Sequence, residues 1–364
     1  MEPILCWHDT QRTSYLDVVF NAWNARTQPE GITQHENSSK TNHKSDGEQR
    51  VKTLAEQRIR RITQAGAITS LYMDVKPDWE QWFLFQSDNH HDSIACNRVL
   101  EKKHLDEAKD KGAYVMIFGD LFDAMQGRFD PRRSMDALRP EYRRDDYYDF
   151  VVSDFAQFYS PYIDQLLLIS DGNHELSVLK NANTNLPDRL VRDHLNRLPD
   201  VKRGVIHGGY GGWVRFMFSI DGNPLHSIRL KYFHGSGGEA PVTRGAIQTN
   251  RQAVYLPDAN IVINGHSHNA YYIPISRERI GGKGKQYFDI QHHVRIPGYK
   301  QDYGDGTTGW EVTRGGVPKP IGAWWCRMYF DGTSVQTQFI PAIKGSEPVA
   351  IAPYLYTGIE YPQE

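Results

Sequence analysis

Residues 166–175 read LLLISDGNHE, a short aliphatic run that breaks off into a dense polar motif. Four other stretches have the same form: WFLFQS, YVMIF, IRLKYF and ANIVI each lead, within three residues, into an Asp or a His. Runs of this length and composition are typical of buried strands. A ligand-type residue after each of five strands is what an α/β sheet needs to gather such side chains at one edge. The sequence therefore predicts an α/β fold with a polar site at its strand ends.

The polar motifs that follow the five runs offer oxygen and nitrogen donors and no sulfur. They are Asp88-Asn89-His90, Gly119-Asp120, Gly172-Asn173-His174-Glu175, His234-Gly235 and Gly265-His266-Ser267-His268. Two Asp, one Asn and four His suit a pair of divalent Mn, Fe or Zn ions better than a structural zinc site.

The order and spacing of the motifs resemble the calcineurin-like metallophosphoesterase superfamily, whose pattern runs D-x-H, G-D, G-N-H-[D/E], H and G-H-x-H. The motifs cover about residues 82–275. The resemblance implies a four-layer α-β-β-α sandwich with two mixed sheets. We expect an N-terminal extension over 1–80, helical and partly linker, then a metallophosphoesterase domain over 81–345 and a tail over 346–364.

The resemblance also assigns ligands to two metal ions. The first ion would be held by Asp88, His90, Asp120 and His268. The second would share Asp120 and add Asn173, His234 and His266. A shared carboxylate offsets the repulsion between two ions that lie about 3.5–4 Å apart. We expect Mn²⁺, although Fe and Zn accept the same donors.

The family's G-N-H histidine reaches the phosphate, which makes His174 the expected general acid. A hydrogen-bonded structural histidine is the alternative. Glu175 and Asp123 are expected to orient ligands. Gly265 is expected to adopt a backbone conformation that bulkier residues would resist.

The first motif leaves its register open, because His91 or Asp92 could ligate in place of His90. The D-x-H spacing favours His90, since residues two apart on an extended segment point to the same side. The remaining histidines are treated as ordinary, among them His207, His226, His292 and His293.

The implied reaction is hydrolysis of a phosphate ester by a metal-bridging hydroxide, without a covalent intermediate. The wording GDLFD is similar to the SbcD/Mre11 nuclease branch of bacteria and phages, although that branch has G-N-H-D. The stretches GDLFDAMQG and SDGNHE lack the two arginines of the protein phosphatases. A phosphodiesterase or nuclease is therefore favoured. A phosphomonoesterase (nucleotide or protein phosphatase) and a non-catalytic nucleic-acid-binding scaffold remain alternatives.

Substrate contacts are less clearly marked. Arg244 and Arg251 follow His234 and are expected to bind substrate. An insertion over 128–144 holds six arginines, either for phosphate or for salt bridges with the acidic residues among them. The basic stretch 47–65 has a helical pattern and could touch nucleic acid or be a solvated face. Aromatic residues in a late Gly-rich segment could stack on bases or simply pack: Tyr299, Tyr303 and Trp310.

Composition sets outer limits. The chain of 364 residues has a formal net charge of −2, so charge implies no partner. Three cysteines argue against a disulfide scaffold. There is no secretory signal pattern and no apolar run near the roughly 20 residues of a membrane span. We therefore expect a soluble cytoplasmic protein, in the host cytoplasm if it is phage-encoded. Nothing in the sequence indicates an oligomeric state.

Overall fold

The computed structural model describes residues 59–124, 135–198, 203–237, 243, 245–303, 310–313 and 315–344. The chain divides into the units Met1–Arg50 and Val51–Glu364, and every described residue belongs to the second. Everything below concerns that second unit.

One sheet has six strands in the order β13-β12-β3-β4-β5-β6. The strands β3 to β6 run parallel, β12 is antiparallel to β3, and β13 is antiparallel to β12. Their bounds are β3 Glu80–Gln86, β4 Tyr114–Phe118, β5 Leu166–Ser170, β6 Ile206–His207, β12 Gly322–Phe330 and β13 Val335–Ile343.

The second sheet has seven strands in the order β1-β2-β7-β8-β9-β11-β10. It is also mixed, because β2–β7, β8–β9 and β9–β11 are parallel pairs and the others are antiparallel. Its bounds are β1 Arg61–Ala65, β2 Ile68–Asp74, β7 Gly211–Ile220, β8 Asn223–Phe233, β9 Ile261–Asn264, β10 Tyr271–Ile280 and β11 Gln286–Arg295.

The two sheets share one apolar core, and alternation along the strands shows how it forms. On β3, Phe83 and Phe85 join a cluster with Phe216 of β7 and Leu230 of β8, so these side chains fill the space between the sheets. Leu84 lies between them in sequence but belongs to a different cluster. Successive side chains of a strand point to opposite faces, which makes β3 apolar on both sides.

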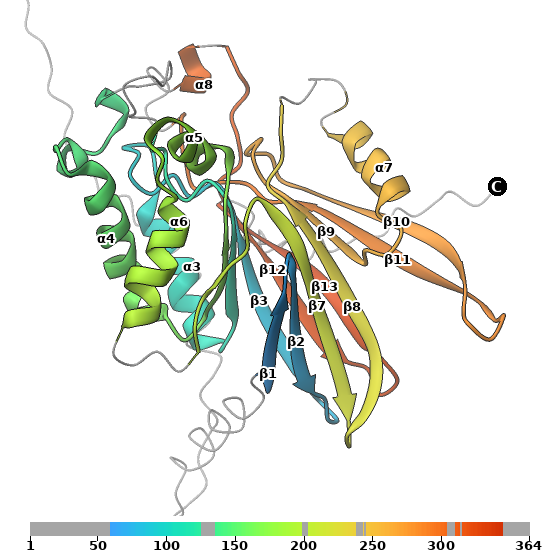
Figure 1. The fold of residues 1–364 in the computed structure, drawn as a ribbon. Helices are drawn as coiled ribbons and strands as arrows, with labels where there is room; N and C mark the ends of the chain where they lie inside the picture. Colours follow the sequence, from blue (N-terminus) through green and yellow to red (C-terminus); the bar gives the residue numbers. More distant parts are fainter. Residues whose placement is uncertain are drawn as a thin grey trace, which may run out of the picture. The chain divides into compact units, whose positions relative to one another are not determined.

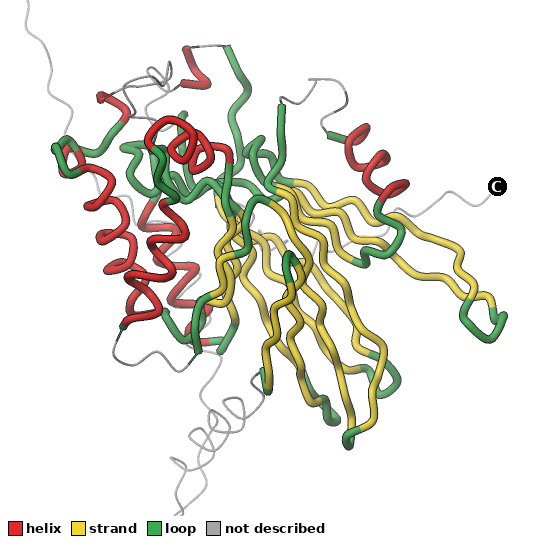
Figure 2. The backbone as a smooth tube through the Cα atoms, in the orientation of Figure 1, coloured by secondary structure: helices red, strands yellow, loops and turns green. Residues whose placement is uncertain are grey.

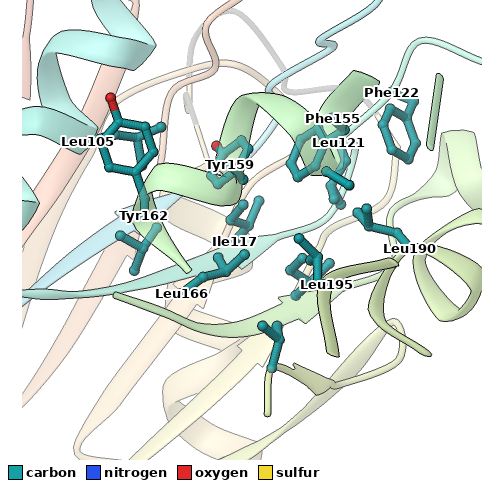
Figure 3. Packing of buried hydrophobic residues seen from close by; sticks show 14 of the residues in the cluster. Leu105, Ile117, Leu121, Phe122, Phe155, Tyr159, Tyr162, Leu166, Leu190 and Leu195 are labelled. Atoms are coloured by element: carbon teal, nitrogen blue, oxygen red, sulfur yellow. The ribbon is translucent and has the colours of Figure 1, made fainter. Parts of the chain in front are cut away.

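The second cluster lies between the six-stranded sheet and its helices. Leu121 and Ile117 pack there with Phe155 and Tyr159 from a helix, as Figure 3 shows. The helices covering this face are α3 Arg98–Asp110, α4 Tyr147–Tyr159, α5 Asn173–Ala182 and α6 Leu186–Arg189 (Figure 1). Short 3₁₀ turns occur at Met135–Ala137, Pro140–Tyr142, Ser160–Tyr162 and Leu195–Arg197, and a π turn at Leu190–His194.

The seven-stranded sheet is accompanied by α7, Ala246–Tyr255. The carbonyl of Leu256, just after this helix, accepts a bond from Gln291 of β11. A short helix α8, Trp310–Thr313, lies in the late Gly-rich segment. The order of layers is helices, sheet, sheet and α7, so the predicted sandwich with two mixed sheets is confirmed.

The predicted N-terminal helical extension needs correction in its described part. Residues 61–65 form β1 rather than the end of a basic helix, and β2 pairs with β7 in the seven-stranded sheet. Gly66 at φ 55° makes the turn between β1 and β2. The part of the extension up to residue 58 lies outside the described residues.

A membrane-crossing helix would need a long apolar stretch, and the described residues contain no helix that meets this requirement.

Candidate metal centre

The five predicted strands all occur, and each ends at its polar motif. Asp88 and His90 follow β3, Asp120 follows β4, and Asn173 opens α5 after β5. His234 follows β8 of the other sheet, and the last motif follows β9. In Figure 2 the loops that carry these motifs cluster at one end of the strands. The expected edge is therefore built from both sheets, three strands from one and two from the other.

The first group of converging side chains consists of Asp88, His90 and His268, whose donor atoms lie within 4.8 Å of one another. The Nε2 atom of His268 lies 3.2 Å from Oδ1 of Asp88 and 3.1 Å from Nε2 of His90. Two facing imidazole nitrogens share one proton at best, whereas both can offer lone pairs to one cation. The donor set therefore fits a metal ion.

The second group consists of Asp120, His234 and His266, again within 4.8 Å. Nε2 of His234 lies 3.1 Å from Oδ2 of Asp120 and 4.0 Å from Oδ1 of Asp88, which joins the two groups. The Oδ1 atom of Asn173 lies 2.6 Å from Nδ1 of His266. All seven predicted ligands are thus brought together, and the contact between His234 and Asp88 links the two groups.

The backbone at these positions is unusual. Asp88, His90, Asp120, His266 and His268 have φ angles of 52°, 46°, 49°, 72° and 54°. Positive φ is uncommon for residues other than glycine, and such conformations concentrate at binding and catalytic sites. The surrounding structure therefore holds the backbone of five predicted ligands at positive φ angles that are unfavourable for these residue types.

Glycines make room for the ligands. A Cβ atom at Gly172 would lie 2.0 Å from Oδ1 of Asp120, and one at Gly265 would lie 2.0 Å from Oγ of Ser87. The role expected for Gly265 is corrected accordingly. Space requires glycine there, while the positive φ angles fall on His266 and His268.

The buried charges also fit a cation. Burial by itself would raise the pKa of Asp120, but His234 and His174 hold it well below its usual range. Burial would lower the pKa of His234, yet Asp120 and Asp88 raise it to about 10. An imidazolium at His234 therefore balances the buried carboxylates in the metal-free protein. A divalent ion bound between the same groups would take over this role.

His174 is positioned by three polar contacts. Its backbone N–H donates to Oδ1 of Asp120 at 3.0 Å, and its ring Nδ1 donates to the backbone carbonyl of Asp123 at 2.6 Å. Its Nε2 lies 3.8 Å from Oδ2 of Asp120. The hydrogen bond of Nδ1 therefore fixes the ring, and Nε2 lies beside the two groups of predicted ligands.

Asp123 and Glu175 contact the residues they were expected to orient. Oδ1 of Asp123 lies 3.0 Å from Nδ1 of His90, which leaves Nε2 of that ring for the metal group. Glu175 accepts backbone N–H bonds from Gly172 at 2.8 Å and from Asp120 at 3.1 Å. It therefore ties the loops after β4 and β5 together, and burial with the charge of Asp120 raises its pKa to about 8.

The register of the first motif is now clear. His91 points away from the groups, with Nδ1 3.2 Å from Oε2 of Glu101 on α3. Asp92 accepts backbone N–H bonds from Asp123 and Ala124. Both are buried and occupied, so His90 alone of the three faces the site.

Several residues near the site had no sequence signal. Nζ of Lys300 lies 2.9 Å from Oδ1 of Asp123. The Ser87 hydroxyl lies 2.6 Å from Oδ2 of Asp88. Nη1 of Arg295 donates to the carbonyl of Gly265 at 2.5 Å. Only the position of Ser87 at the end of a strand could have drawn attention to it.

Other predicted residues have mixed outcomes. Arg251 lines a hollow beside the site, while Arg244 and the first part of the arginine-rich insertion, residues 128–134, lie outside the described residues. In its described part Arg139 pairs with Glu141 and Arg144 with Asp146, as the salt-bridge alternative expects. Tyr299 is fully buried and its hydroxyl bonds to Gln86, so its role is packing rather than base stacking. Among the described residues, His207, His226, His292 and His293 belong to no potential metal group.

Two hollows lie near the site. One of about 160 Å³ is lined by Gly235, Ser267, Arg251 and Arg295, among others. The other, of about 390 Å³, is lined by Lys300, Lys319 and Lys344 together with the acidic Asp302 and Glu311, among others. Lys319 bonds to Asn269, the residue after His268. Each hollow therefore has a lining residue at the site: Ser267 in one, and Lys300, which pairs with Asp123, in the other.

No protein-family model and no curated protein matches the chain. Among solved structures it is similar to GAP50, the anchor in the inner membrane complex of Plasmodium, at 12% identity and a TM-score of 0.38, over 74% of this chain and 87% of that one. It is also similar to Vps29 complexed with Zn²⁺ from Entamoeba histolytica, at 11% identity and a TM-score of 0.28, over 72% and 99%. A metallophosphoesterase from Sphaerobacter thermophilus gives 13% identity and a TM-score of 0.29, over 72% and 89%. These likenesses are distant.

Proposed function

We propose that this protein is a phosphoester hydrolase of the calcineurin-like metallophosphoesterase type that uses two divalent metal ions, with Mn²⁺ as the expected metal. The observation that carries the proposal is the junction of the two donor groups. Nε2 of His234 lies 3.1 Å from Asp120 and 4.0 Å from Asp88, so the groups form one centre. Paired centres of oxygen and nitrogen donors serve phosphoryl transfer.

The ligands divide between two positions. Asp88, His90 and His268 would hold one ion, and His234, His266 and Asn173 the other, with Asp120 between them. Bound there, the ions would supply a nucleophilic water at neutral pH and stabilise charge on the phosphoryl oxygens.

His174 would act on the substrate side. Because Nδ1 donates to the Asp123 carbonyl, Nε2 carries a proton only in the imidazolium form. Nε2 faces Oδ2 of Asp120 at 3.8 Å. The ring can then donate to a phosphoryl oxygen and protonate the leaving alcohol.

The two hollows favour a phosphodiester over a monoester. A diester carries a group on each side of its phosphorus, and two hollows adjoin the candidate site. The linings include Arg251 in one hollow, and three lysines beside Asp302 and Glu311 in the other. Basic side chains bind the phosphates of a nucleic acid backbone, so a nuclease or nucleotide phosphodiesterase is the favoured form.

The test compares hydrolysis of bis-p-nitrophenyl phosphate with that of p-nitrophenyl phosphate in the presence of Mn²⁺. We expect the diester to be cleaved faster, and Asp120→Ala and His174→Ala to abolish or strongly reduce turnover. Faster cleavage of the monoester would favour a phosphomonoesterase instead. Metal binding without turnover of either substrate would favour a non-catalytic nucleic-acid-binding scaffold, in which His174→Ala changes nothing.

A further inference from the structure

The hollow beside His234 and His266 is lined by one face of α7. Gln248, Arg251, Gln252 and Tyr255 all contribute to it. Their spacing of three, four and seven residues places them on the same side of a helix. The helix therefore presents a row of polar side chains, ending in an aromatic ring, toward a space next to the proposed metals.

The carboxamide groups of Gln248 and Gln252 on this face lack, among the described residues, the hydrogen-bond partners that buried polar groups usually have. The Oε1 atom of Gln248 is buried and has no hydrogen-bond partner. Gln252 is 8% exposed, and its side chain makes no hydrogen bond to the described residues. Buried polar atoms normally have partners, so an unsatisfied one beside a hollow points to a ligand that supplies the missing bond.

The chemistry of the lining favours a neutral polar ligand over a second anion. The guanidinium of Arg295 already donates to the carbonyl of Gly265 and to the hydroxyl of Tyr271. Arg251 is exposed at the edge of the hollow. A carboxamide combines a donor with an acceptor, which matches the paired donors and acceptors on the edge of a nucleobase.

The hollow also offers a ring for stacking. Tyr255 is 63% exposed and lies seven residues after Gln248 on the same helix face. Stacking on an aromatic side chain contributes about 1–3 kcal/mol per base. The hollow of about 160 Å³ has room for a single small planar group.

We propose that this hollow is a nucleobase subsite in which Gln248 and Gln252 read the base edge and Tyr255 stacks on the base. It rests on the proposed function, because the base would belong to a phosphoester bound at the metals. The adjoining Gly235 and Ser267 are neighbours in sequence of His234 and His266, so a nucleotide can span both sites.

The test measures how much the base adds to binding. AMP, GMP, CMP and UMP are compared with ribose 5-phosphate by calorimetry on the full chain in EDTA, which prevents hydrolysis. The same compounds are then used as inhibitors of bis-p-nitrophenyl phosphate cleavage in the metal-loaded chain. We expect at least one nucleotide to bind about tenfold or more tightly than ribose 5-phosphate in both measurements.

Variants connect this preference to α7. Gln248→Ala with Gln252→Ala should remove the preference, while Val254→Ala, at an 81% exposed position of the same helix, should keep it. Gln252→Glu replaces a donor by an acceptor at constant shape and should change the order of preference among the four bases. Equal binding of ribose 5-phosphate and all nucleotides, or a preference that survives the double substitution, would overturn the subsite.

These outcomes are separate from failure of the proposed function. A chain that does not cleave bis-p-nitrophenyl phosphate but prefers a nucleotide in calorimetry retains the subsite and loses the hydrolase proposal. A chain that cleaves the diester but ignores the base retains the hydrolase proposal and loses the subsite.

Discussion

Lys300 and Asp123 form an ion pair at 2.9 Å across 177 residues of sequence, next to the candidate metal centre. Asp123 is the same carboxylate that lies 3.0 Å from Nδ1 of His90. Burial alone would raise its pKa, but Lys300 and His90 hold it well below its usual range. Lys300 therefore keeps charged the group that fixes the orientation of a predicted ligand.

We predict that Lys300→Met lowers kcat/KM for phosphodiester cleavage by about 10- to 100-fold, the usual effect of removing a group that supports a ligand. Without the ammonium, the pKa of Asp123 rises and the carboxylate holds His90 less firmly. The affinity for Mn²⁺, measured by titration, should fall together with kcat/KM. Lys319→Met removes a nearby positive charge that contacts Asn269 instead, and equal losses in the two variants would indicate a general charge effect.

A second prediction concerns Asp120, the carboxylate proposed to serve both ions. Asp120→Ala should lower metal content and reduce activity by about a thousandfold or more, because metal catalysis supplies several kcal/mol. Elemental analysis after gel filtration measures the content. Asp258→Ala, at an exposed position on the same chain, is the matched control. Unchanged metal content in Asp120→Ala would contradict the assignment.

Metal binding should also appear in thermal stability. A ligand that binds only the folded state stabilises it by about 2.7 kcal/mol at a hundred times its Kd. Added Mn²⁺ should therefore raise the Tm of the native chain and leave that of Asp120→Ala nearly unchanged. Equal shifts in both proteins would place the binding elsewhere.

His174 should be separable from metal binding. His174→Gln is expected to reduce kcat by about 10²–10⁴-fold, as for loss of a general acid, while metal content stays at the native level. The ring contacts Asp123 and faces Asp120, and it belongs to neither group of the seven predicted ligands. Its donor atom does lie within 4.8 Å of those of His90 and Asp123, so the measured metal content decides between the two roles. His226→Gln, an exposed histidine on β8, controls for loss of an imidazole. A loss of metal together with activity would make His174 a ligand.

The sequence predicts the parts of this site that lie within one short segment, and it does not predict contacts between segments far apart in the chain. The strand LLLIS and the ligand Asn173 lie within one short segment, so an apolar run and a motif reveal both. The pairing of Lys300 with Asp123 leaves no such trace, because it depends on where the loop after β11 meets the loop after β4.

The N-terminal strands show a different kind of failure. The basic residues up to Arg61 suggested a helix, but Gly66 and Ala67 separate two strands that pair with each other. Ile59 and Ile62 pack against the core between the sheets, while most of β1 is exposed at the edge of its sheet. Tertiary pairing with β2 decides the conformation there, and helical periodicity is a poor guide to an exposed edge strand.

The last prediction concerns stability and pH. Nε2 of His207 lies 2.6 Å from Oδ1 of Asp171, behind the loop that carries Asn173. Burial lowers the pKa of His207, but Asp171 outweighs this effect and raises it above 6.5. The pair therefore stabilises the fold fully below about pH 6.5 and loses this contribution as the pH rises through the folded-state pKa. His207→Gln should lower the free energy of unfolding by about 0.5–1 kcal/mol more in acid than at high pH. Denaturant unfolding in acid and at high pH measures this difference. In a chain that already carries Asp171→Asn, His207→Gln should have little pH-dependent effect on the free energy of unfolding. A difference that persists without Asp171 would mean that another group sets the charge on His207.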